Sequence, residues 1–125
     1  MSKKYVEPAI RMVMMPRDTN HLGSIFGGHI LSLIDQAAGI EARRNAPKKF
    51  VTKVMREVEF IAPVFVGDLV SFYTETTKVG RTSVTIRVEV IALRGEDSIT
   101  EQKVTAAEVV MVAVNRQGQS VPLTS

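Results

Sequence analysis

The chain has 125 residues, a length typical of one domain with a single core, and its 45% hydrophobic and 23% charged residues are ordinary values for a folded protein. It contains no cysteine, which excludes disulfide bonds, thiolate metal sites and a cysteine nucleophile. The net charge of +3 comes from lysines and arginines scattered among 13 acidic residues rather than from a continuous basic stripe, so we expect no nucleic-acid partner.

The first residues, MSKKYVEP, lack the apolar core of a signal peptide, and no apolar run approaches the roughly 18 residues that cross a bilayer. We therefore expect a cytoplasmic protein without membrane contact, in which residues 1–125 form one domain and residues 1–7 are loosely ordered. The first strand is predicted at residues 9–15 (AIRMVMM), an apolar run between two prolines.

A loop and a long helix follow. Residues 18–23 (DTNHLG) favour a turn-rich loop, and residues 27–45 have the periodicity of a helix that Pro47 ends. The apolar residues of this helix cover well over half of its circumference, so we expect it to be mostly buried. They are Ile30, Leu31, Leu33, Ile34, Ala37, Ala38, Ile40 and Ala42.

Four segments rich in Val, Thr, Phe and Ile complete the chain and predict strands. They span residues 51–61, 68–78, 82–93 and 99–115. Turn signals at Gly67-Asp68, Gly80-Arg81 and Gly95-Glu96-Asp97 predict antiparallel hairpins between them. The expected fold class is α+β, with one long central helix across an antiparallel sheet of about five strands and a C-terminal tail at residues 116–125. The apolar run VVMVAV (109–114) indicates a second covered face, which an oligomer would supply.

Asp35 is the unusual residue of the predicted helix, because it lies among apolar residues about two turns inside it. On a helical wheel it stands at the border of a polar arc that contains Ser32 and Gln36. It is either an ordinary boundary carboxylate or the reactive group of a site.

Gly27 and Gly28 stand where this helix begins, so their N–H groups lack acceptors within the helix and lie at the positive end of its dipole. Glycine lets a ligand approach such groups closely, and they could stabilise an oxygen that gains negative charge. The alternative is structural, with both glycines serving a loop of positive φ and tight packing.

Other familiar sites do not match. The chain lacks a P-loop, a nucleophile elbow and a dinucleotide fingerprint. Its two histidines, His21 and His29, lie eight residues apart without a third, so we predict no metal site and expect them to be structural or at the rim of a site. Four basic residues near the helix end complement the dipole and are expected to be structural: Arg43, Arg44, Lys48 and Lys49.

Four segments carry a resemblance: MMPRDTNHLGSIFGGHILSLIDQAAG (14–39), VEFIAPVFVGDLVSFY (58–73), KVGRTSVTIRVEV (78–90) and VTAAEVVMVAVNRQG (104–118). They resemble the hotdog-fold acyl-CoA thioesterases, specifically the small bacterial YciA-like branch, which is related to the brain-type acyl-CoA hydrolases. The combination of Asn20, Gly27-Gly28, Asp35 and residues 79–83 is specific, whereas each motif alone is weak.

The resemblance implies a helix wrapped by a curved antiparallel sheet. It also implies that two protomers join their sheets edge to edge with two active sites at the interface, and that such dimers group into hexamers as trimers of dimers. The expected substrate is acyl-CoA. No cofactor is expected, because coenzyme A takes part only within substrate and product.

The resemblance also implies residue roles. The acid matching Asp35 acts on the thioester carbonyl from one subunit, while the asparagine matching Asn20 comes from the other. The Gly28 amide would be the oxyanion donor, with Gly27 beside it in contact with substrate. His29 departs from relatives, which often have tryptophan or another bulky residue there, and this affects the shape of the acyl pocket. The hairpin that would hold the nucleotide end of CoA consists of Gly80, Arg81, Thr82 and Ser83.

The chemistry needs no serine or cysteine nucleophile. A thioester carbonyl has little resonance stabilisation and its thiolate leaves readily, so a carboxylate and an oxyanion donor can suffice. We expect Asp35 to act as general base on water, with Asn20 orienting water or substrate, although direct attack to give a mixed anhydride stays open. Arg81, with Lys78 near it, suits phosphate geometry, and the alternative is that these charged residues flank a hairpin turn and are simply solvated. The alternative function is a non-catalytic acyl-CoA-binding or sensing module of the same fold; a hotdog dehydratase is disfavoured because neither histidine matches its catalytic position.

Overall fold

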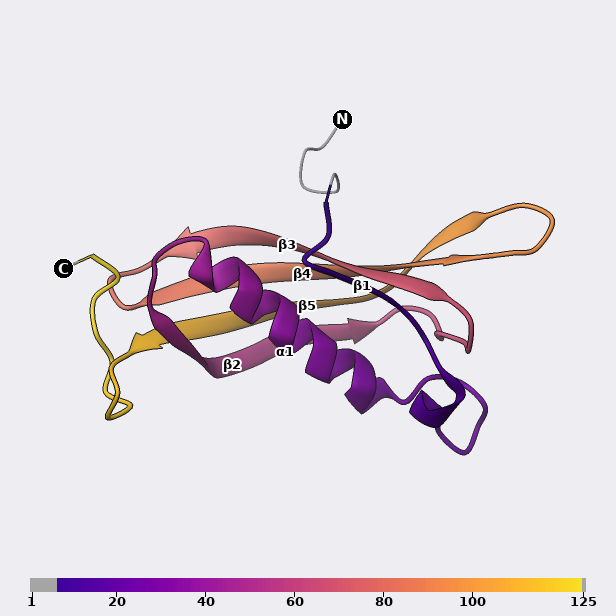
Figure 1. Ribbon diagram of the computed structural model, residues 1–125, viewed down its shortest axis with the longest axis horizontal. Coiled ribbons are helices and arrows are strands. Elements are labelled where there is room, and N and C mark those ends of the chain that lie inside the picture. Colours follow the sequence, from indigo (N-terminus) through magenta and orange to yellow (C-terminus); the bar gives the residue numbers. More distant parts are fainter. Residues whose placement is uncertain (1–6, 125) are drawn as a thin grey trace.

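A single long helix lies against one face of a five-stranded antiparallel sheet in the computed structural model, which describes residues 7–124 (Figure 1). The strand order across the sheet is β1-β3-β4-β5-β2. The elements are β1 (Ile10–Val13), the short 3-10 helix η2 (Pro16–Asp18), α1 (Gly27–Arg43), β2 (Lys49–Phe60), β3 (Leu69–Val79), β4 (Ser83–Arg94) and β5 (Thr100–Val114). The predicted α+β class is confirmed, and each predicted strand or helix boundary lies within two residues of the observed one. Residues 1–6, most of the segment expected to be loosely ordered, lie outside the described residues.

The core forms between α1 and the strand residues that point toward it. In β4 every second residue from Val84 to Ala92 is fully buried, which is the alternation of a strand with one covered face. Ile40, expected in the apolar face of α1, is 45% exposed, because it follows Gln36 by one helical turn and shares its outward side. Neither helix within residues 7–124 has the length and apolarity needed to span a bilayer. The buried residues of α1 are Ile30, Leu33, Ile34, Ala37, Ala38 and Ala42.

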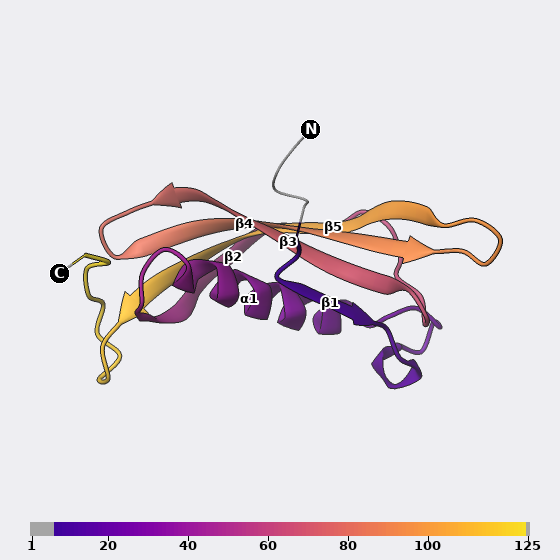
Figure 2. The same cartoon turned by 45° about the horizontal axis from the view of Figure 1, so that its top comes forward.

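The opposite face of the sheet carries no helix or further layer from residues 7–124 (Figure 2). Four charged residues of alternating sign form a row across the middle of this face. Each strand from β3 to β2 contributes one of them: Glu75 of β3, Arg87 of β4, Glu108 of β5 and Arg56 of β2. The hydrogen bond from Arg56 to Glu108 raises the pKa of the Arg56 guanidinium. Four valines lie on one side of this row, at positions 51, 54, 110 and 112. The second cover that the apolar strands predict is therefore not supplied by this part of the chain.

The connection between β2 and β3 corrects one prediction. The hairpin expected at Gly67-Asp68 is wrong, because β2 pairs with β5 while β3 pairs with β4 and β1. Residues 61–68 instead cross the end of the sheet from one side to the other. Gly67 does turn the chain, with a φ of 91° that favours glycine. The other two predicted hairpins, β3–β4 at Gly80-Arg81 and β4–β5 at residues 95–97, are confirmed.

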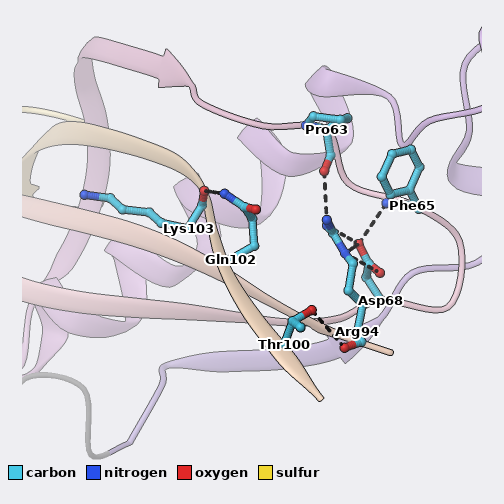
Figure 3. Close-up of polar contacts among 7 residues, drawn as sticks. All are labelled: Pro63, Phe65, Asp68, Arg94, Thr100, Gln102 and Lys103. Atoms are coloured by element: carbon cyan, nitrogen blue, oxygen red, sulfur yellow. Dashed lines mark hydrogen bonds and ion pairs between the residues drawn. The ribbon is translucent and has the colours of Figure 1, made fainter. Parts of the chain in front are cut away.

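Asp68 and Arg94 fasten this crossover to the end of β4 (Figure 3). The Asp68 side chain is only 4% exposed, and its carboxylate accepts hydrogen bonds from Nη2 of Arg94 at 2.7 Å and from Nε at 3.1 Å. The same carboxylate accepts the N–H of Phe65 at 2.9 Å, and Arg94 Nη2 also donates to the carbonyl of Pro63 at 3.1 Å. The buried charge is thus fully paired, which is the condition for tolerating it inside a protein.

Replacing Asp68 with Asn should lower the free energy of unfolding by about 3 kcal/mol, because Arg94 then lacks its counter-charge in a largely buried position. Urea unfolding followed by circular dichroism measures this loss. Asp97→Asn is the matched control, since Asp97 is an exposed acid in the β4–β5 connection. The control should change the free energy by less than about 0.5 kcal/mol, and equal losses in the two variants would contradict the assigned role of Asp68.

Candidate active site

Helix α1 begins at Gly27 and Gly28. The Phe26 carbonyl accepts the N–H of His29 at 3.0 Å and that of Ile30 at 3.4 Å. The first carbonyl of the helix thus bonds to residues 29 and 30, so the N–H groups of Gly27 and Gly28 have no acceptor within the helix and point out of its positive end. The structure thus presents two main-chain donors where the sequence predicts an oxyanion site.

Two aromatic rings pack against these glycines. A Cβ at position 28 would lie 2.6 Å from Cε2 of Phe26, and one at position 27 would lie 3.3 Å from Cζ of Phe60, the last residue of β2. Neither glycine is among the residues with positive φ. The glycines therefore do not serve a loop of positive φ, and a side chain at position 28 would require the exposed Phe26 ring to move.

A cavity of 350 Å³ opens beside Gly28. One of its walls is polar, because Nε2 of His29 lies 3.5 Å from Oδ2 of Asp18. His29 thus lies at the rim of the helix start, while His21 is exposed in the preceding loop. The residues that line the cavity are Arg17, Asp18, Thr19, Phe26, Gly28 and His29.

Asp35 lies half-buried in the middle of α1, on the side that faces the edge strand β2. Its Oδ1 accepts a hydrogen bond from the hydroxyl of Thr52, whose Oγ1 also lies 3.4 Å from Sδ of Met111 on β5. One carboxylate oxygen of Asp35 therefore has a hydrogen-bond partner, while the carboxylate stays partly open to solvent. Thr52 was not among the residues predicted from the sequence. Its position two residues after Phe50 in a predicted strand indicates that both side chains point to the helix-facing side of β2.

Asn20 is tied into its own loop. Its Oδ1 accepts the N–H of Leu22 at 2.8 Å and that of Ser24 at 3.3 Å, and its Nδ2 donates to Oγ of Ser24 at 3.1 Å. These bonds fix the side chain just before the helix start. None of them reaches Asp35, so this chain does not bring the two predicted residues together.

The predicted CoA-binding hairpin lies at the other end of α1 (Figure 1). The N–H of Gly80 donates to the carbonyl of Ser83 at 2.7 Å and closes the turn, and the Arg81 side chain is exposed. The C-terminal tail packs here, since the N–H of Leu123 donates to the Arg81 carbonyl at 2.9 Å. The Thr82 carbonyl accepts the N–H of Ala113 on β5 at 2.8 Å. The hairpin is therefore well fixed but remote from Gly28 of the same chain.

The chain thus holds two separate groups of candidate residues. We call Asn20, Gly27 and Gly28 the entrance half, and Asp35 with Thr52 the carboxylate half. The two halves lie about 10 Å apart along α1, as seven residues of helix require. Together they supply main-chain donors for an oxyanion and a held carboxylate, the parts needed for acyl transfer to water. No group of His, Asp and Glu that could hold a metal occurs within residues 7–124.

Comparisons of this chain with known proteins agree on one family, the thioesterases. The thioesterase superfamily model matches residues 22–99. An uncharacterised acyl-CoA thioester hydrolase of Zymomonas mobilis is 49% identical over 83 residues, which cover 66% of this chain and 56% of that protein's length. The acyl-CoA thioester hydrolase YciA of Salmonella typhimurium is 37% identical over 119 residues, which cover 94% of this chain and 90% of that protein.

A solved structure agrees with these relatives. The hexameric hotdog-fold thioesterase of Campylobacter jejuni is similar to this chain with a TM-score of 0.91 and 44% identity, and the match covers 94% of this chain and 90% of the other. The resemblance predicted from the sequence, including the hotdog fold, is confirmed.

Proposed function

Since this chain belongs to the thioesterase superfamily, we propose that it hydrolyses the thioester bond of acyl-CoA to give free coenzyme A and a carboxylic acid. The observation that carries the proposal is the Asp35 carboxylate, which lies half-buried on the side of α1 that faces β2 and accepts a hydrogen bond from Thr52. The relatives named as acyl-CoA thioester hydrolases support the choice of substrate. The reaction uses water and groups of the chain alone, with coenzyme A only as part of substrate and product.

Asp35 acts as general base in this proposal. Thr52 holds Oδ1, which leaves Oδ2 to take a proton from a water molecule as its oxygen attacks the thioester carbon. The carbonyl oxygen becomes an oxyanion that accepts hydrogen bonds from the N–H of Gly28. The C–S bond then breaks and the CoA thiolate leaves without strong acid assistance. Direct attack by Asp35, with a mixed anhydride as intermediate, is the competing route.

The separation of the two halves favours a site shared by two protomers. A carbonyl bound at Gly28 lies too far along the axis to touch Asp35 of the same helix directly. A two-fold pairing of protomers would place the entrance half of one chain beside the carboxylate half of the other, twice per dimer. Asn20 of the partner would then orient the water or the substrate, as the resemblance implies.

The same pairing gives the remote hairpin a role. We assign Arg81 to the phosphates of CoA, with Gly80, Thr82 and Ser83 shaping the turn that presents it. The exposed guanidinium and the fixed backbone of this turn support the assignment. Because the Campylobacter jejuni thioesterase is hexameric, we further propose that dimers of this chain assemble into hexamers.

Replacing Asp35 with Asn should reduce kcat/KM by at least about 1000-fold while leaving the protein folded, because the amide cannot accept the proton from water. Release of CoA, followed with a thiol-reactive dye on an acyl-CoA series, measures this. Undiminished turnover would reject Asp35 as the base. Tight acyl-CoA binding by the unmodified protein without CoA release would favour the non-catalytic binding module instead.

Mixed oligomers test whether sites are shared. Asp35→Asn chains and Asn20→Ala chains should each be poorly active alone, and co-expression should restore about one quarter of the normal sites, since half of random dimers are mixed and each holds one intact site. Differently tagged chains purified in two steps allow the mixed species to be assayed directly. Failure to regain activity in a verified mixed oligomer would show that Asp35 and Asn20 act from the same chain.

Thr52 provides a test of positioning. Thr52→Val keeps the shape of the side chain but removes the hydroxyl, and should lower kcat about 10-fold or more with little change in KM, because Asp35 loses its orienting bond. Thr52→Ser retains the hydroxyl and should keep most of the activity. A purely structural role for Thr52 would instead give equal losses in both variants, in step with their unfolding free energies.

A further inference from the structure

The chain turns sharply after β5 and returns beside the hairpin between β3 and β4 (Figure 1, Figure 2). Asn115 forms this turn. Its Oδ1 accepts the N–H of Gln117 at 2.9 Å and that of Gln119 at 3.0 Å, a bonding pattern with which asparagine side chains stabilise turns. Gly118 has a φ of 82°, which favours glycine. Local hydrogen bonds therefore set the direction in which the C-terminal tail leaves the sheet.

Main-chain hydrogen bonds join the tail to the hairpin. The Thr82 carbonyl accepts the N–H of Ala113 at 2.8 Å, and the Ala113 carbonyl accepts the N–H of Val121 at 2.9 Å. Two residues further on, the N–H of Leu123 donates to the Arg81 carbonyl at 2.9 Å. The carbonyls of two neighbouring hairpin residues are thus bonded, one to β5 and the other to the tail.

The tail is anchored by one side chain. Leu123 is 8% exposed and belongs to the hydrophobic core, whereas Thr124 and residues 116–120 are exposed. Burial of a leucine side chain stabilises a short segment strongly, so core packing determines where the N–H of Leu123 lies. The side chain of Arg81 is exposed, and the tail therefore acts on its main chain alone.

We propose that Leu123 is a positioning residue for coenzyme A, because it holds the main chain of Arg81 where the guanidinium can reach the phosphates. This inference rests on the proposed function, which assigns Arg81 to those phosphates. A guanidinium binds a phosphate best through two parallel hydrogen bonds, so its contribution depends on the direction from which it approaches. A hairpin released from the tail would have to be ordered again when the ligand binds, and affinity would fall.

A thioester without a nucleotide separates this role from a general loss of structure. S-butyryl-pantetheine carries the same acyl group and thioester as butyryl-CoA but no phosphate. Leu123→Ala should raise KM for butyryl-CoA about 10-fold, with little change in kcat and none in the constants for S-butyryl-pantetheine. Leu123→Met keeps an apolar side chain of similar volume and should largely retain the unmodified KM.

Two comparisons show whether Leu123 acts through Arg81. Arg81→Ala should give the same selective loss, and the double variant should lose no more than Arg81→Ala alone, since both changes remove one interaction. Val90→Ala is the matched control, because Val90 is fully buried in β4 and lies about 23 Å along the strand from Ser83. It should leave the ratio of the two KM values unchanged.

Two results would overturn the inference. Equal losses on both substrates in Leu123→Ala, as in Val90→Ala, would show that Leu123 supports stability only. Additive losses in the double variant would show that Leu123 acts independently of Arg81. If Leu123→Ala does not fold, Asn115→Ala loosens the turn without emptying the core and should give the same selective loss, whereas Gln117→Ala in the same turn should not. An unchanged KM for butyryl-CoA in folded Asn115→Ala would then decide against the inference.

Binding distinguishes the inference from the proposed reaction. In the Asp35→Asn background, Leu123→Ala should raise the dissociation constant of butyryl-CoA about 10-fold, as measured by calorimetry, and leave that of S-butyryl-pantetheine unchanged. A selective loss in Arg81→Ala without one in Leu123→Ala would overturn the inference alone. Unchanged binding in Arg81→Ala would remove the phosphate assignment of Arg81 and the inference with it. Absence of hydrolysis in the unmodified protein would overturn only the proposed reaction, since these dissociation constants test the tail directly.

Discussion

The fold depends on one long helix that must cover one face of a five-stranded sheet by itself. Helix α1 meets this requirement with small residues, since Ala37, Ala38 and Ala42 are fully buried and bring the helix close to the strands. Such close contact excludes polar side chains from the face toward the sheet and leaves them at the flanks and on the outward side of the helix. Asp35 lies on the flank that faces β2, where the sheet ends, so its carboxylate can pair with Thr52 and still reach solvent or a ligand. The packing constraint therefore decides where on α1 a carboxylate can lie.

The periodicity of apolar residues predicts the strands and the helix because it shows which side of each is buried against the rest of the protein. The alternation in β4 and the broad apolar stripe of α1 gave boundaries close to the observed ones. The prediction that Ile40 is buried was wrong, because the buried face of α1 is narrower than the number of apolar residues in the helix indicates. The hairpin at Gly67-Asp68 was wrong for a different reason: a turn signal shows that the chain changes direction, and it does not show which strand comes next in the sheet.

The site could be predicted only in part for the same physical reason. Gly27, Gly28 and Asp35 could be predicted as candidates because each breaks a local pattern, either two glycines at a helix start or an acid beside an apolar run. Thr52 breaks no such pattern, since a threonine is ordinary in a strand. Its proposed role rests on the contact with Asp35, 17 positions earlier, which exists only once β2 lies at the sheet edge beside α1. Long-range pairing of this kind is a property of the topology.

The crossover of residues 61–68 connects the stability of the fold to the entrance half of the site. Arg94 holds both Asp68 and the carbonyl of Pro63, and the next carbonyl, that of Val64, accepts the N–H of Ile25 at 2.7 Å. Ile25 ends the loop that carries Asn20 and leads directly into the glycines of α1. The buried ion pair at the end of β4 is thus connected to the proposed oxyanion donors through residues 63–64 of the crossover and Ile25 of the loop. An apolar pair could fill the same space, but it could not also bind the backbone carbonyl of Pro63, and the position of the helix start would then depend on packing alone.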